Sequence, residues 1–142
     1  MVRIEPFRPE HLLAIRLQAT QATAQALMTL DHGRQIAECK GFAQSAMLAG
    51  APIASAGVIE LWPGRAYAWA YIGEQAARHW KTVHRAVNAA LDGARWRRIE
   101  MAVDVRDPGA KRWAHHLGFD FEGVARKWTT DGRDVEIWAR VN

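Results

Sequence analysis

One run of the chain, residues 107–119, limits the folds open to this sequence more than any other. Asp107 is a favoured N-cap residue, Pro108 suits the first helical position, and Gly118 suits the left-handed residue after a helix. Between these signals, apolar residues recur at helical spacing: Ala110, Trp113, Ala114 and Leu117. The run therefore predicts a short helix that buries this apolar stripe and lies between two strands.

Apolar patterns elsewhere predict strands and helices in a mixed order. Strand patterns cover residues 66–72 and 99–103, and two more strands flank a hairpin turn at Asp131-Gly132. Helical patterns begin near residue 8, cover residues 22–39 with a break near Asp31-His32-Gly33, and are longest over residues 74–92. Because that longest helix connects residues 66–72 to residues 99–103, these strands should run parallel. The expected fold class is α/β, a mixed and mostly antiparallel sheet with a central parallel pair that splays, and helices on both faces.

The composition fits one folded domain over residues 1–142. Hydrophobic residues make up 49% of the chain, which argues against disorder. The single cysteine, Cys39, excludes an internal disulfide and fits a reducing compartment. No signal-peptide core and no run of about 20 apolar residues is present, so we expect a cytoplasmic protein without a membrane partner.

A net charge of +4 suits either nucleic acid or a polyphosphate cofactor. The densest basic cluster is Arg95-Trp96-Arg97-Arg98, which is either an ordinary solvated corner or a phosphate or partner contact. No nucleic-acid signature accompanies it, so nucleic acid is not an expected partner. The histidines show no metal-ligand spacing, and we expect no metal site.

The run at residues 107–119 resembles the late helix of GNAT acyltransferases, whose usual pattern is N-x-x-A-x-x-x-Y-x-x-x-G-F. Asp107 stands for the asparagine, Ala110 and Gly118-Phe119 match, and Ala114 stands where the tyrosine belongs. Residues 58–65 and 98–101 resemble small GNAT-like proteins of tailed phages and prophages, some labelled internal virion proteins. The resemblance implies the GNAT (acyl-CoA N-acyltransferase) fold, as a single domain over residues 1–142.

The resemblance also implies acetyl-CoA as co-substrate, with its pyrophosphate at the start of the long helix, where N–H groups and the helix dipole favour anions. The usual loop there reads [RQ]-x-x-G-x-[GA]. Here Gln75 matches, but Arg78 and Trp80 replace the two small residues. These bulky side chains either close the cradle, which is the pyrophosphate-binding loop, or Arg78 turns outward and contacts phosphate directly. The expected cofactor-binding residues are Ala70, Tyr71, Ile72, Gly73, Gln75, Ala77, Arg78, His79, Trp80, Asp107 and Ala110.

Direct acetyl transfer to an amine needs a base, an oxyanion donor and a proton for the leaving thiolate. Glu60 is the candidate base, because a carboxylate on a mostly apolar strand face should hold protons more tightly. A strand-edge or salt-bridged glutamate is the alternative reading. The resemblance implies an oxyanion donor on the backbone near Tyr71 or Ile72, which makes Tyr71 the second catalytic candidate. Candidates for the missing acid are Tyr67, Tyr71, His115 and His116.

Two functions follow from the resemblance. The leading one is an acetyl-CoA-dependent N-acetyltransferase that acts on an amine of a small molecule or a protein. The alternative is a GNAT-fold phage protein that has lost catalysis and has an interaction or virion-associated role. A cofactor cleft that is retained favours the first, and one closed by Arg78 and Trp80 favours the second. The assembly, including a homodimer or a virion component, is left open.

Overall fold

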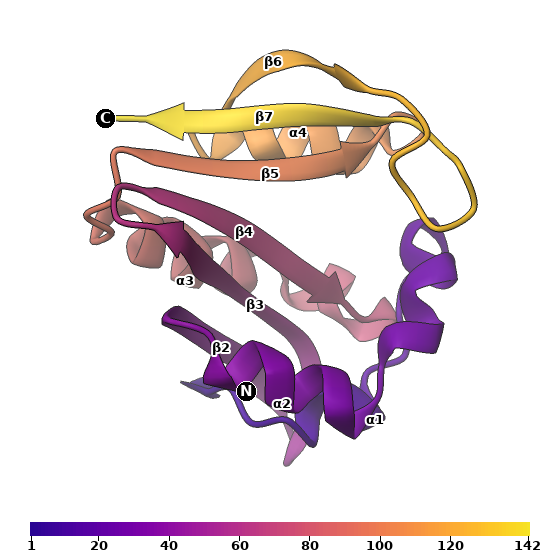
Figure 1. Ribbon diagram of the computed structural model, residues 1–142. Helices are drawn as coiled ribbons and strands as arrows, with labels where there is room; N and C mark the ends of the chain where they lie inside the picture. The colour runs from indigo at the N-terminus through magenta and orange to yellow at the C-terminus, as the bar shows by residue number, and fades with distance from the viewer. The chain divides into compact units, whose positions relative to one another are not determined.

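The computed structural model describes all of residues 1–142 and is of the predicted α/β class, with one mixed sheet in the order β1-β2-β3-β4-β5-β7-β6 (Figure 1). The strands are β1 (Val2–Pro6), β2 (Gly41–Leu48), β3 (Ala51–Trp62), β4 (Arg65–Ile72), β5 (Arg98–Asp104), β6 (Asp120–Ala125) and β7 (Val135–Val141). The α-helices are α1 (His11–Ala14), α2 (Leu30–Glu38), α3 (Trp80–Asp92) and α4 (Pro108–His116), and the 3-10 helices are η1 (Ala19–Leu27) and η2 (Glu74–His79). No helix is long and apolar enough to cross a membrane.

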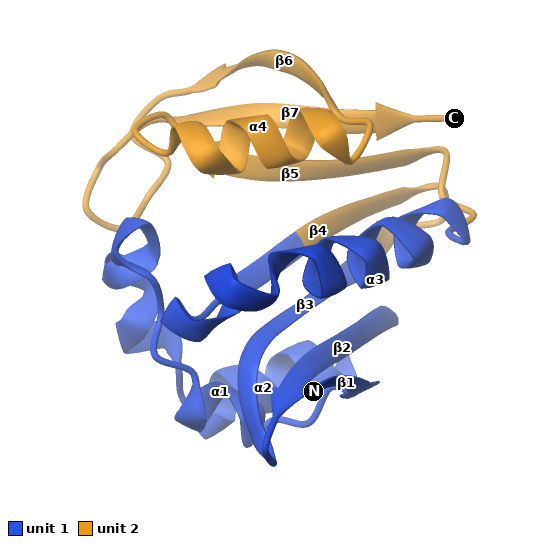
Figure 2. Cartoon of the chain, turned by 180° about the vertical axis from the view of Figure 1, so that it is seen from behind, with its two compact units in different colours: residues 1–59, 69–94 blue, residues 60–68, 95–142 orange.

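The chain divides into two compact units, shown in different colours in Figure 2. The first unit contains residues 1–59 and 69–94, and the second contains residues 60–68 and 95–142. Within the first unit, α1 and α2 lie on one face of the strands and α3 lies on the other, so both faces carry helices as predicted. Within the second unit, α4 lies along β5 and β7.

Strands β4 and β5 run parallel, as the helical connection between them predicted. Their register pairs Arg65 with Arg98 and ends where Tyr67 pairs with Glu100, although β4 continues to Ile72. The pairs β1·β2, β2·β3, β5·β7 and β6·β7 are antiparallel. Residues 68–72 of β4 therefore continue beyond the part of the strand that pairs with β5.

Helix α4 begins and ends where the sequence predicted. Asp107 Oδ1 accepts a hydrogen bond of 3.0 Å from the Ala110 N–H, which caps the first turn. Gly118 follows the helix with a φ of 84°, a conformation that favours glycine. The prediction for Trp113 was too strong, because this residue is half-buried while Ala114 is fully buried. Tryptophan is so large that it is rarely enclosed completely.

The N-terminal helices differ from their predicted boundaries. The break expected near Asp31-His32-Gly33 lies earlier, because the Thr29 hydroxyl accepts a hydrogen bond of 3.2 Å from the His32 N–H. These three residues therefore form the first turn of α2. Helix α1 is also shorter than expected, since it ends at Ala14 and Leu17 forms an antiparallel bridge with Gly73.

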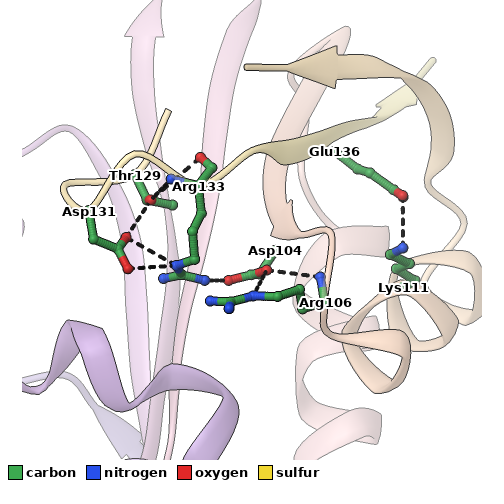
Figure 3. A network of polar contacts seen from close by, with 7 residues as sticks. All are labelled: Asp104, Arg106, Lys111, Thr129, Asp131, Arg133 and Glu136. Carbon is green, nitrogen blue, oxygen red and sulfur yellow. Dashed lines mark hydrogen bonds and ion pairs between the residues drawn. The ribbon is translucent and has the colours of Figure 1, made fainter. Parts of the chain in front are cut away.

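The predicted turn at Asp131-Gly132 is present between the antiparallel strands β6 and β7, where the Gly132 N–H donates to the Thr129 carbonyl at 3.0 Å. It lies within a longer loop over residues 126–134 than the sequence predicted. Figure 3 shows Arg133 of this loop between Asp104, at the end of β5, and Asp131. Arg133 Nε donates to Asp131 Oδ2 at 2.8 Å, and its backbone N–H donates to the Thr129 hydroxyl at 2.7 Å. A third ion pair, of 2.9 Å, joins Lys111 of α4 to Glu136 of β7. The ion pair with Asp104, which is far from the loop in the sequence, holds Arg133, and local turn signals cannot predict this contact.

One face of β4 packs into the core of the first unit. A buried cluster lies beneath it, with Trp69 and Tyr71 partly buried against it, and contains Leu12, Ile15, Leu17, Met28 and Ile36. The Trp69 ring lies 5.6 Å from the Tyr71 ring and 5.5 Å from the Phe7 ring, measured between centroids. The aromatic residues that alternate along β4 therefore have a structural role on this face.

A buried polar chain lies in the same unit. His11 Nδ1 is 2.7 Å from the Ser45 hydroxyl, which is 2.7 Å from the Ser55 hydroxyl. All three residues are buried. Burial lowers the pKa of His11, and the neighbouring Arg8 lowers it further. The imidazole is therefore held in its neutral form within this chain.

Candidate functional site

The predicted site residues are divided between the two compact units. Residues 70–73, at the end of β4, and residues 75–80 lie in the first unit. Glu60, Asp107 and Ala110 lie in the second unit. The first unit therefore holds nearly all of the predicted cofactor contacts on one continuous stretch of chain.

The end of β4 has one edge toward β3 and one edge away from it. The Gly73 N–H donates a hydrogen bond of 2.8 Å to the Ile53 carbonyl of β3. Successive residues of a strand direct their backbone groups to opposite edges. The N–H and C=O groups of Ala70 and Ile72 therefore lie on the edge away from β3, which we call the outer edge of β4.

Residues 16–21 fill this outer edge. The Gln21 side chain donates from Nε2 to the Ala70 carbonyl at 2.8 Å and accepts at Oε1 from the Ile72 N–H, also at 2.8 Å. The Gln18 N–H donates to the Ile72 carbonyl at 3.0 Å, and the Glu74 N–H donates to the Arg16 carbonyl at 2.9 Å. A side-chain amide and a short backbone bridge thus replace a neighbouring strand.

Gly73 is required where these backbones meet. A Cβ atom at this position would lie 2.5 Å from the Ile53 carbonyl oxygen and 3.3 Å from the Arg16 carbonyl oxygen. A side chain would therefore collide with β3 on one side and crowd the bridging segment on the other. The lack of a side chain allows three backbone segments to approach closely here.

The helix predicted over residues 74–92 is divided. Its first part is the 3-10 helix η2, and the α-helix begins only at Trp80, where His79 makes no side-chain cap. The Arg78 residue is exposed, while Trp80 is half-buried. Glu74, also exposed, adds a negative charge to the first turn of η2.

Tyr71 is paired with a histidine that the sequence analysis did not single out. His32 Nε2 of α2 lies 2.9 Å from the Tyr71 hydroxyl, and the two rings meet edge to face. Burial raises the pKa of Tyr71, so the phenol keeps its proton at neutral pH. The hydroxyl is thus a protonated group with a fixed partner.

Glu60 lies near the end of β3 in the second unit, and its carboxylate is half-buried. Its Oε1 accepts a hydrogen bond of 2.9 Å from the indole Nε1 of Trp96. This bond fixes the orientation of the carboxylate. It is compatible with a structural glutamate as well as with a base.

A second carboxylate, Glu100 of β5, is more deeply buried, with 8% of its surface exposed. Arg65 Nε donates to Glu100 Oε1 at 3.0 Å, and Arg98 Nε donates to Oε2 at 2.7 Å. Burial alone would raise the pKa of Glu100, but the two guanidinium groups outweigh it and hold this pKa below its usual value. Arg98 also binds Glu122, at 2.6 and 3.0 Å. Of the basic cluster predicted at residues 95–98, this network pairs Arg98 with carboxylates.

Comparison with solved structures supplies the fold that this geometry belongs to. The chain matches an acetyltransferase of the GNAT family from Streptococcus pneumoniae with a TM-score of 0.67, at 15% identity and over 100% of both chains. It has the GNAT fold. Ard1 from Thermoplasma volcanium has a TM-score of 0.77 at 17% identity, covering 99% of this chain and 97% of that one. The sequence matches no family model and no curated protein.

A third similar structure is the ribosomal-protein-S18-alanine N-acetyltransferase from Escherichia coli. Its TM-score is 0.76 at 16% identity, and the match covers 99% of this chain and 94% of that one. The fold expected from the resemblance is therefore confirmed. In this chain the fold includes the parallel β4·β5 pair and the crossover through η2 and α3 that the sequence predicted.

Three residues of this GNAT fold were absent from the predicted site: Gln21, His32 and Glu100. Gln21 lies in an alanine- and glutamine-rich stretch in which no position stands out. Glu100 gave a weak signal, since it is the one acidic residue in the apolar run 99–103. Asp107, by contrast, was predicted as a cofactor contact, and its Oδ1 serves as the N-cap of α4.

Proposed function

We propose that the protein is an N-acetyltransferase that transfers an acetyl group from acetyl-CoA to an amine. The observation that carries this proposal is the outer edge of β4, where the Ala70 carbonyl and the Ile72 N–H together bind a carboxamide. The pantetheine arm of CoA contains amides of the same chemistry. The GNAT fold of the chain supports the same assignment.

The residues present fit CoA at two places. The outer edge of β4 offers one acceptor and one donor to an amide, with Gly73 at its end. Arg78 and His79 follow on η2 and would hold the pyrophosphate, since a guanidinium suits phosphate oxygens. The further contacts proposed on this stretch are Gln75, Ala77 and Trp80, and those proposed in the second unit are Asp107 and Ala110.

Acetyl-CoA would supply the thioester carbonyl that the amine attacks. On the enzyme side, Glu60 would take a proton from the incoming ammonium, whose pKa of about 10 keeps it charged at neutral pH. Of the candidate oxyanion donors near Tyr71 and Ile72, only the Ile72 N–H lies on the outer edge, so it would either bind the pantetheine amide or donate to the developing oxyanion. The protonated Tyr71 hydroxyl, held by His32, would supply the proton for the leaving thiolate. It would replace the tyrosine usual in the family, whose position Ala114 occupies here.

A second function is favoured by one specific observation. Ala114 occupies the position of the usual tyrosine and is fully buried in α4. A protein of this fold that has lost catalysis, with an interaction or virion-associated role, would tolerate this replacement. This alternative predicts neither CoA binding nor turnover.

Calorimetry with acetyl-CoA, followed by a thiol-release assay against a panel of amines, tests the proposal. We expect saturable binding of one acetyl-CoA per chain and release of CoA thiol only when a suitable amine is present. A chain that binds no CoA, both as wild type and with Gln21 replaced by alanine, would contradict the proposed activity. The same result, with no turnover on any amine, would favour the second function.

A further inference from the structure

We infer that Gln21 is an internal competitor for the outer edge of β4. In the ligand-free chain its side-chain amide holds the Ala70 carbonyl and the Ile72 N–H, both at 2.8 Å. A ligand that needs this edge must first displace Gln21. The inference rests on the proposed function, because the ligand we assign to the edge is the pantetheine arm of CoA.

The contact reproduces the pairing of a strand with its neighbour. A carboxamide carries one acceptor and one donor in a single plane, as a peptide group does. Gln21 uses both toward residues of one strand that lie two positions apart, Ala70 and Ile72. The Ile72 N–H has a single proton and can donate to only one good acceptor at a time. A second amide therefore cannot occupy the same edge while Gln21 is bound.

The segment that carries Gln21 lies between two anchored ends. Leu17 before it is 4% exposed and Met28 after it is 8% exposed, so both ends are anchored in the core. Between them, η1 contains no buried residue. Little apolar surface holds η1 in place, and segments of this kind open at a low cost in free energy.

A second glutamine keeps the segment in register without touching β4. Gln25 Oε1 accepts from the Leu17 N–H at 3.0 Å, and Gln25 Nε2 donates to the Ile15 carbonyl at 3.2 Å. This side chain ties η1 to the residues just before it. Gln25 thus stabilises the segment itself, while Gln21 is the side chain that closes the edge of the strand.

The consequence is a reduced apparent affinity. Only the fraction of molecules in which Gln21 has left Ala70 and Ile72 can bind the arm, so the measured Kd equals the intrinsic Kd divided by that fraction. Removing the Gln21 carboxamide should raise the open fraction. Ligands that do not reach β4 should be unaffected.

The test compares Gln21→Ala with a matched variant, Gln18→Ala. Gln18 precedes the same helix, but it reaches β4 through its backbone N–H, which alanine retains. By calorimetry, we expect Gln21→Ala to bind CoA about tenfold more tightly, the change expected from roughly one net hydrogen bond. Gln18→Ala should bind as the wild type does. All three proteins should bind 3′-phosphoadenosine 5′-diphosphate, which lacks the pantetheine arm, with equal affinity.

Amide hydrogen exchange provides a readout that does not depend on CoA. The Ile72 amide should exchange faster in Gln21→Ala than in the wild type and in Gln18→Ala, since water replaces the Gln21 acceptor. Unchanged exchange at Ile72 would overturn the inference, because Gln21 would then not close the edge.

The outcomes separate this inference from the proposed function. If the wild type binds CoA and Gln21→Ala binds it no more tightly, competition by Gln21 is refuted while the proposed function stands. If only the variant binds, both stand and the wild-type edge is closed. If neither protein binds CoA, the proposed function fails, and the assignment of the pantetheine arm to this edge fails with it.

Discussion

The indole N–H of Trp96 donates a hydrogen bond of 2.9 Å to one carboxylate oxygen of Glu60. Trp96 precedes β5 and Glu60 lies near the end of β3, so the bond joins two segments that are far apart in the sequence. If Glu60 is the base of the proposed reaction, this bond orients it. If Glu60 is a structural residue, its role is to hold these two segments together through this bond.

Two substitutions distinguish these roles. Glu60→Gln retains an oxygen that can accept from Trp96 but removes the base, and should lower kcat about 100-fold or more. Trp96→Phe removes the indole donor and keeps the carboxylate, so it should change kcat much less. The measurement is kcat between about pH 6 and pH 9. Over this range the acceptor amine is mostly protonated, so the reaction needs a base. Wild-type turnover by Glu60→Gln at every pH would assign the carboxylate to a structural role.

Arg78 should contribute to CoA binding through phosphate. The residue is exposed at the end of η2, and a hydrogen bond to a charged group contributes roughly 1.5–3 kcal/mol. Arg78→Ala should weaken CoA binding by about that amount, measured by calorimetry. The matched control is Arg85→Ala, which removes an exposed arginine further along α3. Equal losses in both variants would indicate a general charge effect in place of a specific contact.

Glu100 should be important for stability. Glu100→Gln leaves two guanidinium groups without their buried partner, and we expect a loss of about 1–3 kcal/mol in the free energy of unfolding. Glu122→Gln is the control, because that side chain is 40% exposed and its ion pair should contribute at most about 1 kcal/mol. Chemical denaturation at neutral pH measures both. A larger loss in the Glu122 variant would show that the exposed pair is the stronger one.

The pH dependence of this effect has a definite sign. The folded-state pKa of Glu100 lies below the unfolded value of about 4.3, so its stabilisation is present above that pH. It is lost as the pH falls through the folded-state pKa. The difference between wild type and Glu100→Gln should therefore shrink in acid. A difference that grows on acidification would contradict the ion-paired state.

The elements with local signals were predicted well. Asp107, Pro108 and Gly118 mark the ends of α4 in the sequence itself, and the parallel β4·β5 pair follows from the helix that connects them. Features that depend on tertiary contacts were missed. The loop at residues 126–134 depends on the pairing of Arg133 with Asp104. The break before α2 was misplaced for another reason, since its Thr29 cap is a local contact that the sequence analysis did not use.

The candidate site shows the same limit more clearly. The sequence predicted which stretch, residues 70–80, would form the cofactor cradle, because fold and motif both point to it. It could not predict that Gln21, about fifty positions earlier, occupies the edge of that stretch. One glutamine among several has no periodic or motif signal, and only the folded chain brings it to Ala70 and Ile72.

The buried chain of His11, Ser45 and Ser55 should make stability depend on pH near neutrality. The folded-state pKa of His11 lies below the unfolded value of about 6.5. At pH values between these two pKa values, the unfolded chain binds more protons than the folded chain. Stability is therefore highest above that pH and falls as the pH drops below it. His11→Gln removes the titrating group and should abolish this part of the slope.

Urea denaturation of wild type and His11→Gln at pH 8 and at pH 5.5, values about one unit or more either side of the unfolded pKa, provides the test. The advantage of the wild type over the variant should be smaller at the lower pH, because protonation costs the folded wild type its neutral imidazole. Ser45→Ala is the control, since it breaks the contact at 2.7 Å but keeps the histidine and its titration. An advantage that is equal at both pH values would show that His11 keeps an ordinary pKa in the folded chain.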